Sequence, residues 1–181
     1  MPIQTPICDF GQKAIPFELK STDNKILSLN DIKGENGTLI MFICNHCPYV
    51  IHYHDEIKRL ANDFDNTINM VAISSNDIEE YPQDGPDKMR ELWVQLGLSF
   101  PYLFDSTQDV AKQYKAECTP EFYLFDSSQK LIYRGRLDES SPNSGLEPTG
   151  EDLRNAIENV LNNKDVNADQ FPSMGCNIKW K

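Results

Sequence analysis

The sequence lacks a long hydrophobic run and holds fewer basic than acidic residues. Its longest apolar run, Leu39 to Cys44, is far too short to cross a membrane as a helix. The 181 residues include 17 lysines and arginines against 28 aspartates and glutamates, a formal net charge of −11. Because so acidic a chain repels phosphate backbones and anionic lipid surfaces, neither nucleic acid nor a membrane is an expected partner.

Other sequence features are also missing. The N-terminus has no basic segment followed by an apolar stretch, so no signal peptide is visible and a cytoplasmic location is expected. There is no internal repeat and no low-complexity segment. Hydrophobic residues make up 39% of the chain and charged residues 25%, which predicts a globular protein. The length suits one domain over residues 1–181 and is short for two.

Cysteine is scarce and unevenly spread. The five cysteines are Cys8, Cys44, Cys47, Cys118 and Cys176. An odd number at wide spacing, without an export signal, argues against a framework of structural disulfides. In a reducing compartment, a close pair of cysteines points instead to catalysis or to metal binding.

The pattern of apolar residues predicts alternating strands and helices. Strands are expected at 38–43, 68–74, 102–104, 122–125 and 131–136, and helices at 45–64, 84–96, 108–115 and 151–161. A short hairpin (17–19 and 25–29) precedes them, and a polar tail (162–181), expected to pack on or near the domain, follows. This order predicts an α/β protein with a central mixed β-sheet flanked by helices. It is the order of the thioredoxin fold, with an N-terminal hairpin extension and a C-terminal tail.

The segment Cys44-Asn45-His46-Cys47-Pro48 lies between the first buried strand and the long helix. A helix N-terminus presents unpaired N–H groups and a partial positive charge, which favour a thiolate. Two intervening residues allow the sulfurs to form a disulfide. We expect Cys44 to be the exposed nucleophile of low pKa and Cys47 the sheltered resolving thiol. A protonated His46 would stabilise the thiolate further and make the disulfide a better oxidant.

Two other interpretations of the cysteine pair remain open. It could be half of a zinc or copper site, or a purely structural pair. However, a second Cys-x-x-Cys is missing, and His52 and His54 are two residues apart, on different faces of the expected helix. We therefore expect no metal and no cofactor, and keep a metal-binding or redox-sensing module as the alternative of another class.

A second group, Cys118-Thr119-Pro120, comes just before an expected strand. At this point of a thioredoxin fold, the Thr-Pro bond is typically cis and packs against the cysteine pair. The residue before the proline can offer its backbone to an extended substrate, as one strand does to another. Thr119 and Pro120 are thus candidate substrate-supporting residues, and Cys118 is expected near Cys44.

Five stretches spread over nearly the full length carry a family resemblance: 41–50, 74–77, 118–122, 133–138 and 172–180. Through them the chain resembles the peroxiredoxin-like branch of the alkyl hydroperoxide reductase/thiol-specific antioxidant (redoxin) family, within the thioredoxin-like superfamily. The resemblance implies a thioredoxin fold and an antioxidant role in redox homeostasis.

Peroxidase activity is a separate question. Peroxiredoxins resemble one another in carrying Thr or Ser three residues, and Pro seven residues, before the reactive cysteine. Counted back from Cys44 or from Cys47, neither position holds such a residue. Thr119-Pro120 stands in the region where their arginine is expected. We therefore rank thiol–disulfide exchange above reduction of hydroperoxides, with protein or small-molecule disulfides and thiols as partners and a thiol reductant to reset the pair.

Cys118 and Cys176 have no assigned role from spacing. Cys118 lies beside the expected cis-proline, and Cys176 lies in a tail that could fold back over the site. Either one of them relays electrons to or from the Cys44–Cys47 pair, or both are spare thiols.

Overall fold

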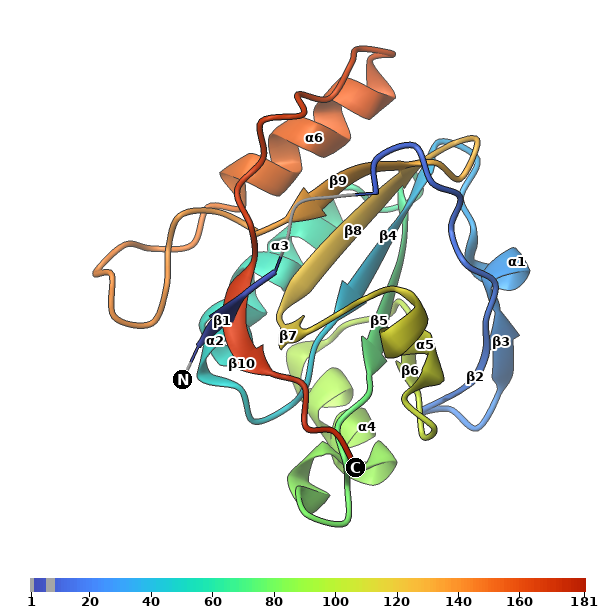
Figure 1. Ribbon diagram of the computed structural model, residues 1–181, viewed down its shortest axis with the longest axis vertical. Helices are drawn as coiled ribbons and strands as arrows, with labels where there is room; N and C mark the ends of the chain where they lie inside the picture. The colour runs from blue at the N-terminus through green and yellow to red at the C-terminus, as the bar shows by residue number, and fades with distance from the viewer. Residues whose placement is uncertain (1, 6–8) are drawn as a thin grey trace.

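A seven-stranded mixed sheet runs through the middle of the structure, a computed structural model that describes residues 2–5 and 9–181 (Figure 1). The strand order is β3-β2-β6-β5-β4-β8-β9. The strands are β2 (Glu18–Ser21), β3 (Ile26–Ser28), β4 (Gly37–Phe42), β5 (Asn69–Ser74), β6 (Tyr102–Phe104), β8 (Glu121–Asp126) and β9 (Leu131–Gly135). β5 pairs in parallel with β4 and β6, and the other neighbours are antiparallel.

Helices cover both faces of this sheet. One face carries α2 (Pro48–His52), α3 (His54–Asp63), α4 (Pro86–Leu96) and α6 (Glu151–Leu161), and the other carries α1 (Leu29–Ile32) and α5 (Asp109–Gln113). Strand β4 shows why both faces are covered. Leu39 and Met41 belong to one hydrophobic core, and Ile40 and Phe42 to the other, because successive side chains of a strand point to opposite faces. The predicted α/β architecture is confirmed.

The long helix expected at 45–64 is wrong in two respects. It begins only at Pro48, and Cys47 before it is extended, with φ −69° and ψ 122°. The cause is Pro48, since a proline keeps the residue before it out of the helical region but fits the first helical position. The helix is also divided at Tyr53, whose N–H bonds to the Val50 carbonyl three residues back.

The N-terminal hairpin is confirmed and belongs to the central sheet. β2 pairs with β3 on one side and with β6 on the other, with Lys20 opposite Phe104. The hairpin therefore extends the edge of the sheet that lies far from β8 and β9 (Figure 1).

A second, three-stranded sheet was not predicted. It joins β1 (Ile3–Gln4), β10 (Met174–Asn177) and β7 (Cys118–Thr119), in the order β1-β10-β7. β10 belongs to the polar tail, which was expected to pack on or near the domain but not to form a strand. In Figure 1 the red β10 runs between β1 and β7, in front of α2. The N-terminal strand β1 and the C-terminal strand β10, far apart in the sequence, thus lie side by side, and β10 borders β7.

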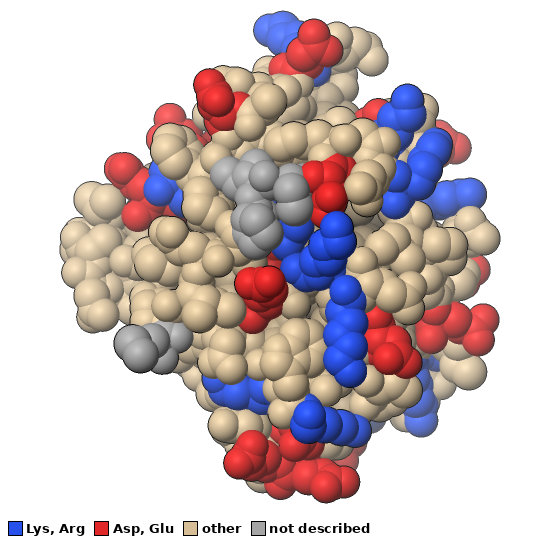
Figure 2. Space-filling view, in the orientation of Figure 1, with Lys and Arg blue, Asp and Glu red and all other residues tan. Residues whose placement is uncertain are grey.

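The described ranges contain no helix that is both long and apolar enough to cross a lipid bilayer. On the face that carries β1 and β10, basic and acidic side chains lie interspersed (Figure 2). The surplus of acidic residues in the sequence is therefore not separated into a one-sign surface on this side of the molecule.

Candidate active site

The cysteine pair lies between the end of β4 and the start of α2. Cys44 and Cys47 are almost completely buried, with 1% and 0% of their surface exposed. Together with Cys118 and Cys176 they are free thiols. Cys8 lies outside the described residues. Both cysteines are thus enclosed between the end of the central strand β4 and the start of α2, the junction that the sequence predicted.

Cys47 is the N-cap residue of α2, without a capping hydrogen bond from its side chain. Its thiol donates to the Thr119 carbonyl oxygen at 3.2 Å, and the Cys44 thiol, the S–H and N–H of Cys176 and the Val50 N–H are neighbours that favour its thiolate form. The Cys44 bond contributes most to lowering the pKa of Cys47, and the other donors add to it, whereas burial acts in the opposite direction. The net effect holds the pKa of Cys47 well below its ordinary value.

Cys44 has the opposite character. Its thiol donates to Cys47, which together with burial raises its pKa, and the charge of Asp84 raises it further. Cys44 is therefore not the exposed thiol that was expected, and the pKa values of Cys44 and Cys47 shift in directions opposite to the expected ones. The physical reason is that Pro48 shifts the helix start to Cys47, so the helix N-terminus acts on Cys47.

Thr119 touches both cysteines. Its Oγ1 lies 3.4 Å from the Cys44 sulfur, and its carbonyl oxygen lies 3.2 Å from the Cys47 sulfur. The Thr119–Pro120 peptide bond is cis, as predicted. The structure thus places Thr119 and Pro120 against the cysteine pair.

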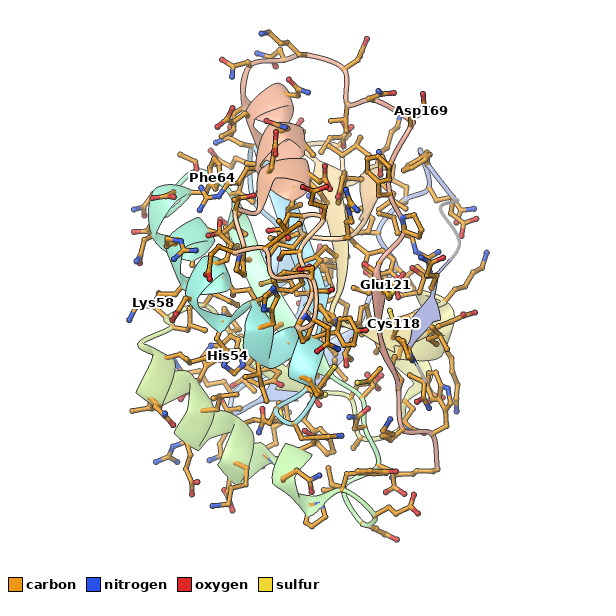
Figure 3. The ribbon with its side chains drawn as sticks, turned by 90° about the vertical axis from the view of Figure 1, so that its left-hand side faces the viewer. His54, Lys58, Phe64, Cys118, Glu121 and Asp169 are labelled. Carbon is orange, nitrogen blue, oxygen red and sulfur yellow. The ribbon has the colours of Figure 1, made fainter. Side chains whose placement is uncertain are left out.

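Cys118 points away from the pair. Its thiol lies 3.8 Å from the Pro120 carbonyl oxygen, and it sits next to Glu121 (Figure 3). Burial first, and then the charge of Glu121, raises its pKa. Arg134, 1% exposed, pairs with the buried Glu121 at 2.8 Å. Cys118 therefore faces a structural ion pair, and its neighbour Thr119 is the residue in contact with the Cys44 sulfur.

Cys176 does reach the site. It lies on β10 opposite Thr119, and it donates to the Cys47 sulfur. Burial and the bond to Cys47 raise the pKa of Cys176 to about 12. Of the two cysteines left open by the sequence, Cys176 is the one in contact with Cys47.

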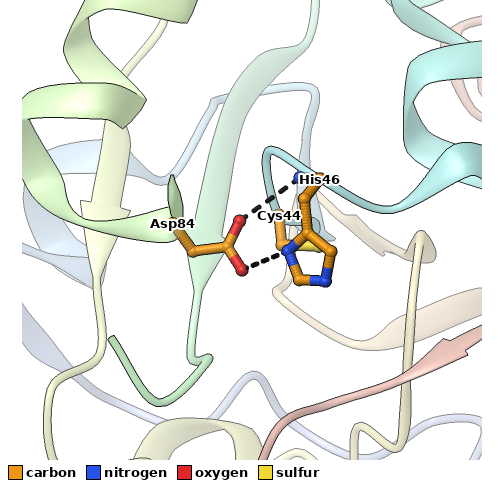
Figure 4. Close-up of side chains that lie close together, drawn as sticks. All are labelled: Cys44, His46 and Asp84. Atoms are coloured by element: carbon orange, nitrogen blue, oxygen red, sulfur yellow. Dashed lines mark hydrogen bonds and ion pairs between the residues drawn. The ribbon is translucent and has the colours of Figure 1, made fainter. Parts of the chain in front are cut away.

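His46 lies beside the pair and is held by a buried carboxylate. Its Nδ1 lies 2.6 Å from Asp84 Oδ2, and its ring stacks on Tyr81 at 5.3 Å between ring centres. Figure 4 shows Asp84 bridging the ring and the backbone N–H of His46, next to Cys44. The buried carboxylate of Asp84 therefore fixes the orientation of the His46 ring beside Cys44.

Asp84 itself anchors the whole segment between the cysteines. It is 0% exposed. Oδ1 accepts from the N–H groups of Asn45 and His46, and Oδ2 accepts from His46 Nδ1 and Asn76 Nδ2. Asp84 ends the short 3-10 helix η1 (Pro82–Asp84). Nothing in the local sequence marks it, because it lies in a polar loop far along the chain from the cysteines.

Three of these residues could be considered as metal ligands. The ligand atoms of Cys44, His46 and Asp84 all lie within 4.8 Å of one another. Each Asp84 oxygen already accepts two hydrogen bonds from N–H groups. A metal ion would have to displace the donors that hold the loop between the cysteines, so this arrangement fits an anchor better than a cation site.

Comparison with known proteins gives a family and two close relatives. The profile of the AhpC/TSA family matches residues 10–134. A crystal structure of an uncharacterised conserved protein from Geobacillus kaustophilus is 47% identical, with a TM-score of 0.98, and the match covers 100% of this chain and 97% of that one. A hypothetical protein from Sinorhizobium meliloti 1021 is 37% identical, with a TM-score of 0.96 over 98% of each chain.

More distant structures identify the fold. The thioredoxin domain of a thiol-disulfide oxidoreductase from Bacteroides vulgatus is 20% identical, with a TM-score of 0.63 over 84% of this chain and 97% of that one. The predicted thioredoxin fold is therefore confirmed. A search of curated proteins gave no match.

Proposed function

The chain belongs to the AhpC/TSA family, and we propose that within it the protein is a thiol–disulfide oxidoreductase in which Cys47 attacks and Cys44 resolves. One observation carries the proposal: Cys47 is the buried N-cap residue of α2, and its neighbours Cys44, Cys176 and Val50 hold its pKa below the ordinary value. A thiolate held in this way is the reactive form in exchange. No metal or organic cofactor enters the reaction.

In the first step, the Cys47 thiolate attacks one sulfur of a substrate disulfide. A Cys47–substrate S–S bond forms, the substrate S–S bond breaks, and the second substrate sulfur leaves as a thiolate that takes up a proton. Thr119 borders the sulfur during this step, because its carbonyl oxygen lies 3.2 Å from Cys47 Sγ.

In the second step, Cys44 loses its proton and attacks Cys47. The Cys44–Cys47 disulfide forms, and the remaining substrate sulfur leaves as a thiolate, so the substrate has gained two electrons. We assign the proton of Cys44 to His46, whose ring nitrogen lies within 4.8 Å of the Cys44 sulfur. A thiol reductant resets the pair, and the reverse sequence oxidises a dithiol.

The hydrogen bonds to Cys47 also bear on the direction of electron flow. They stabilise the dithiol form, so the Cys44–Cys47 disulfide is expected to be a stronger oxidant than thioredoxin. Equilibration with glutathione should give a potential less negative than the value of about −270 mV typical of thioredoxin. A more negative potential would contradict this part of the proposal.

The role assignment is tested by trapping. A Cys44→Ser variant lacks the resolving thiol, so treatment with glutathione disulfide should leave glutathione linked to Cys47, as seen by mass mapping. A Cys47→Ser variant should form no comparable adduct at Cys44. Glutathione on Cys44 in the second variant, at the rate of the first, would reverse the assignment.

Reduction of hydroperoxides is the second candidate. The chain belongs to the AhpC/TSA family, and Cys47 is a buried cysteine of lowered pKa at the start of α2. One observation argues against peroxide reduction. The buried Arg134 is 1% exposed and is paired with Glu121 at 2.8 Å, so it does not supply the arginine expected at a peroxidase site. Stopped-flow mixing with hydrogen peroxide separates the two: fast oxidation that is lost in Cys47→Ser would put peroxidase activity first.

Metal binding remains the alternative of another class, because Cys44, His46 and Asp84 lie close together. Purified protein that holds one equivalent of zinc or copper, released by Cys44→Ser, would favour it. We place the exchange reaction in the cytoplasm, where free thiols are maintained, with disulfides or thiols of proteins and small molecules as partners.

A further inference from the structure

Strand β10 lies where a substrate segment would bind. It pairs antiparallel with β7, with Cys176 opposite Thr119 and Asn177 opposite Cys118. Thr119, opposite Cys176, has its carbonyl oxygen 3.2 Å from the Cys47 sulfur, and Cys176 contributes to lowering the pKa of Cys47. A peptide that adds to a sheet edge makes main-chain pairing of this kind and sends alternate side chains into the site. The tail thus puts a sulfur of its own against the attacking sulfur.

Gly175 makes the close approach possible. A Cβ atom at this position would lie 2.0 Å from the Thr119 carbonyl oxygen and 2.7 Å from the Thr119 carbonyl carbon. Both are backbone atoms, which cannot turn aside as a flexible side chain does. Any strand that binds β7 in the same register therefore needs glycine directly before its cysteine.

β10 also closes the site. With the tail in place, Cys44 and Cys47 are 1% and 0% exposed, so a protein disulfide cannot reach either sulfur. The tail is held at both ends by main-chain contacts. Thr5 N–H donates to the Ser173 carbonyl, and Ile178 N–H donates to the Glu117 carbonyl.

The attachment is of a kind that can be exchanged for another strand. Only two residue pairs join β10 to β7. Met174 and Trp180 are 38% and 40% exposed, and Ile178 is the buried apolar anchor at 1%. A competing strand can restore the main-chain hydrogen bonds of β7 as β10 leaves, which offsets that part of the cost, whereas the pairing of β10 with β1 at Gly175 and Met174 has to be given up or carried along.

We propose that the edge of β7 is a docking site for an extended segment of a substrate protein in which glycine directly precedes the reacting cysteine, and that β10 occupies this site until such a segment displaces it. The inference rests on the proposed exchange by Cys47. It adds a substrate class, a Gly-Cys segment in extended form, and an internal competitor for it.

The test uses two synthetic peptides, Ser-Met-Gly-Cys-Asn-Ile and Ser-Met-Ala-Cys-Asn-Ile, each as a mixed disulfide with thionitrobenzoate. Attack by Cys47 on the peptide sulfur releases the coloured thionitrobenzoate, the better leaving group. The reduced full-length protein should react with the Gly-Cys peptide about tenfold faster or more than with the Ala-Cys peptide.

Gly175→Ala removes β10 from β7 without removing a thiol. It should raise the rate with the Gly-Cys peptide about tenfold or more, because a larger fraction of the protein is open. The preference for Gly-Cys over Ala-Cys should persist, and this ratio does not depend on how much of Cys47 is thiolate. Met174→Ala, on the same strand with an exposed side chain, is the matched control and should behave as the parent protein does.

Ile178→Ala is a second variant that should loosen the tail. It replaces Gly175→Ala in the test if circular dichroism shows that Gly175→Ala is not folded. Equal rates with the two peptides, or no gain in the loosened variant, would overturn the inference. Glutathione disulfide, assayed on the same proteins, reports Cys47 chemistry without a strand docked on β7. If exchange with glutathione disulfide persists but the two peptides react at equal rates, this inference alone is contradicted. If no exchange depends on Cys47, the proposed function is contradicted.

Discussion

Cys47 and Cys118 are both 0% exposed, yet their surroundings drive their acidities apart. Cys47 donates to the Thr119 carbonyl oxygen, yet its neighbours Cys44, Cys176 and the Val50 N–H favour its thiolate form, and its pKa is lowered. Cys118 has the carbonyl oxygen of Pro120 and the charge of Glu121 beside it, and its pKa is raised. Burial by itself disfavours a thiolate at both positions, so the donors around the sulfur decide which cysteine is reactive.

The two environments lie on opposite sides of one short strand. In β7, Cys118 and Thr119 are neighbours in sequence, and successive side chains of a strand point in opposite directions. Thr119 therefore faces the cysteine pair, and Cys118 faces the ion pair of Glu121 and Arg134. The side of β7 that contacts the cysteine pair and the side that contacts the Glu121–Arg134 ion pair thus belong to one two-residue strand.

The largest effect should come from removing the sulfur of Cys47, with Cys118 as the matched control. Cys47→Ser should reduce exchange with glutathione disulfide to the rate of the reaction without protein, because no other thiolate is held at the site. Cys118→Ser should leave the rate unchanged. Measuring glutathione release under identical conditions checks both. Loss of activity in Cys118→Ser with the fold intact would show that the contrast between the two cysteines is misplaced.

Breaking the ion pair should act on stability alone. Glu121→Gln removes the nearer of the two carboxylates beside the buried Arg134, the other being Asp9 at 3.9 Å, which should lower the free energy of unfolding by about 3 kcal/mol. Urea denaturation measures the change. Glu117→Gln, at an exposed position, is the control and should stay within about 0.5 kcal/mol. A change in the titration of Cys47 in Glu121→Gln would mean that the two sides of β7 are coupled.

Asp84→Asn should weaken the anchor of the reactive side. The new amide would turn a donor toward His46 Nδ1 or Asn76 Nδ2, or toward the N–H groups of Asn45 and His46, so one set of hydrogen bonds is lost. We expect a loss of about 2–3 kcal/mol in urea denaturation. The pKa of Cys44 should fall, since the charge of Asp84 raises it. Asp87→Asn, at an exposed position, is the control, and equal losses in both variants would remove the special role of Asp84.

The smallest effect should come from one donor to Cys47. Because the pKa of Cys47 is lowered in the folded protein, the exchange rate should rise with pH through that pKa and level off above it. Cys176→Ala removes the S–H donor, so this profile, and the thiolate absorbance at 240 nm, should move to higher pH by about one unit. Cys118→Ala should leave both unchanged.

The same titration has a consequence for stability. An unperturbed cysteine has a pKa of about 8.5, so the lowered pKa of Cys47 contributes stability that is complete above that pH. The contribution is lost as the pH falls through the pKa of the folded protein. Urea midpoints of the parent protein and of Cys47→Ser, measured across this range, should converge as the pH falls. A difference that grows on acidification would contradict the sign.

Local pattern was sufficient for most of the framework. The apolar run at 38–43 and the strand at 102–104 were predicted because β-branched and apolar residues cluster there, and β4 and β6 occupy these places. The helix at 151–161 follows from its periodicity and is α6. Short elements such as β7 and β10 were not predicted, because two to four residues carry too little periodicity to be recognised.

By itself, then, the sequence determined the alternating framework, the placement of two cysteines at the junction of strand and helix, and the Thr-Pro segment beside them. The tertiary structure decided the opposite pKa shifts of the two cysteines, since Cys176 lies beside Cys47 and the charge of Asp84 acts on Cys44. It also decided that Asp84 anchors the loop and that the tail covers it. Hydrogen bonds and burial between segments far apart in the chain set these features, and no local pattern of residues encodes them.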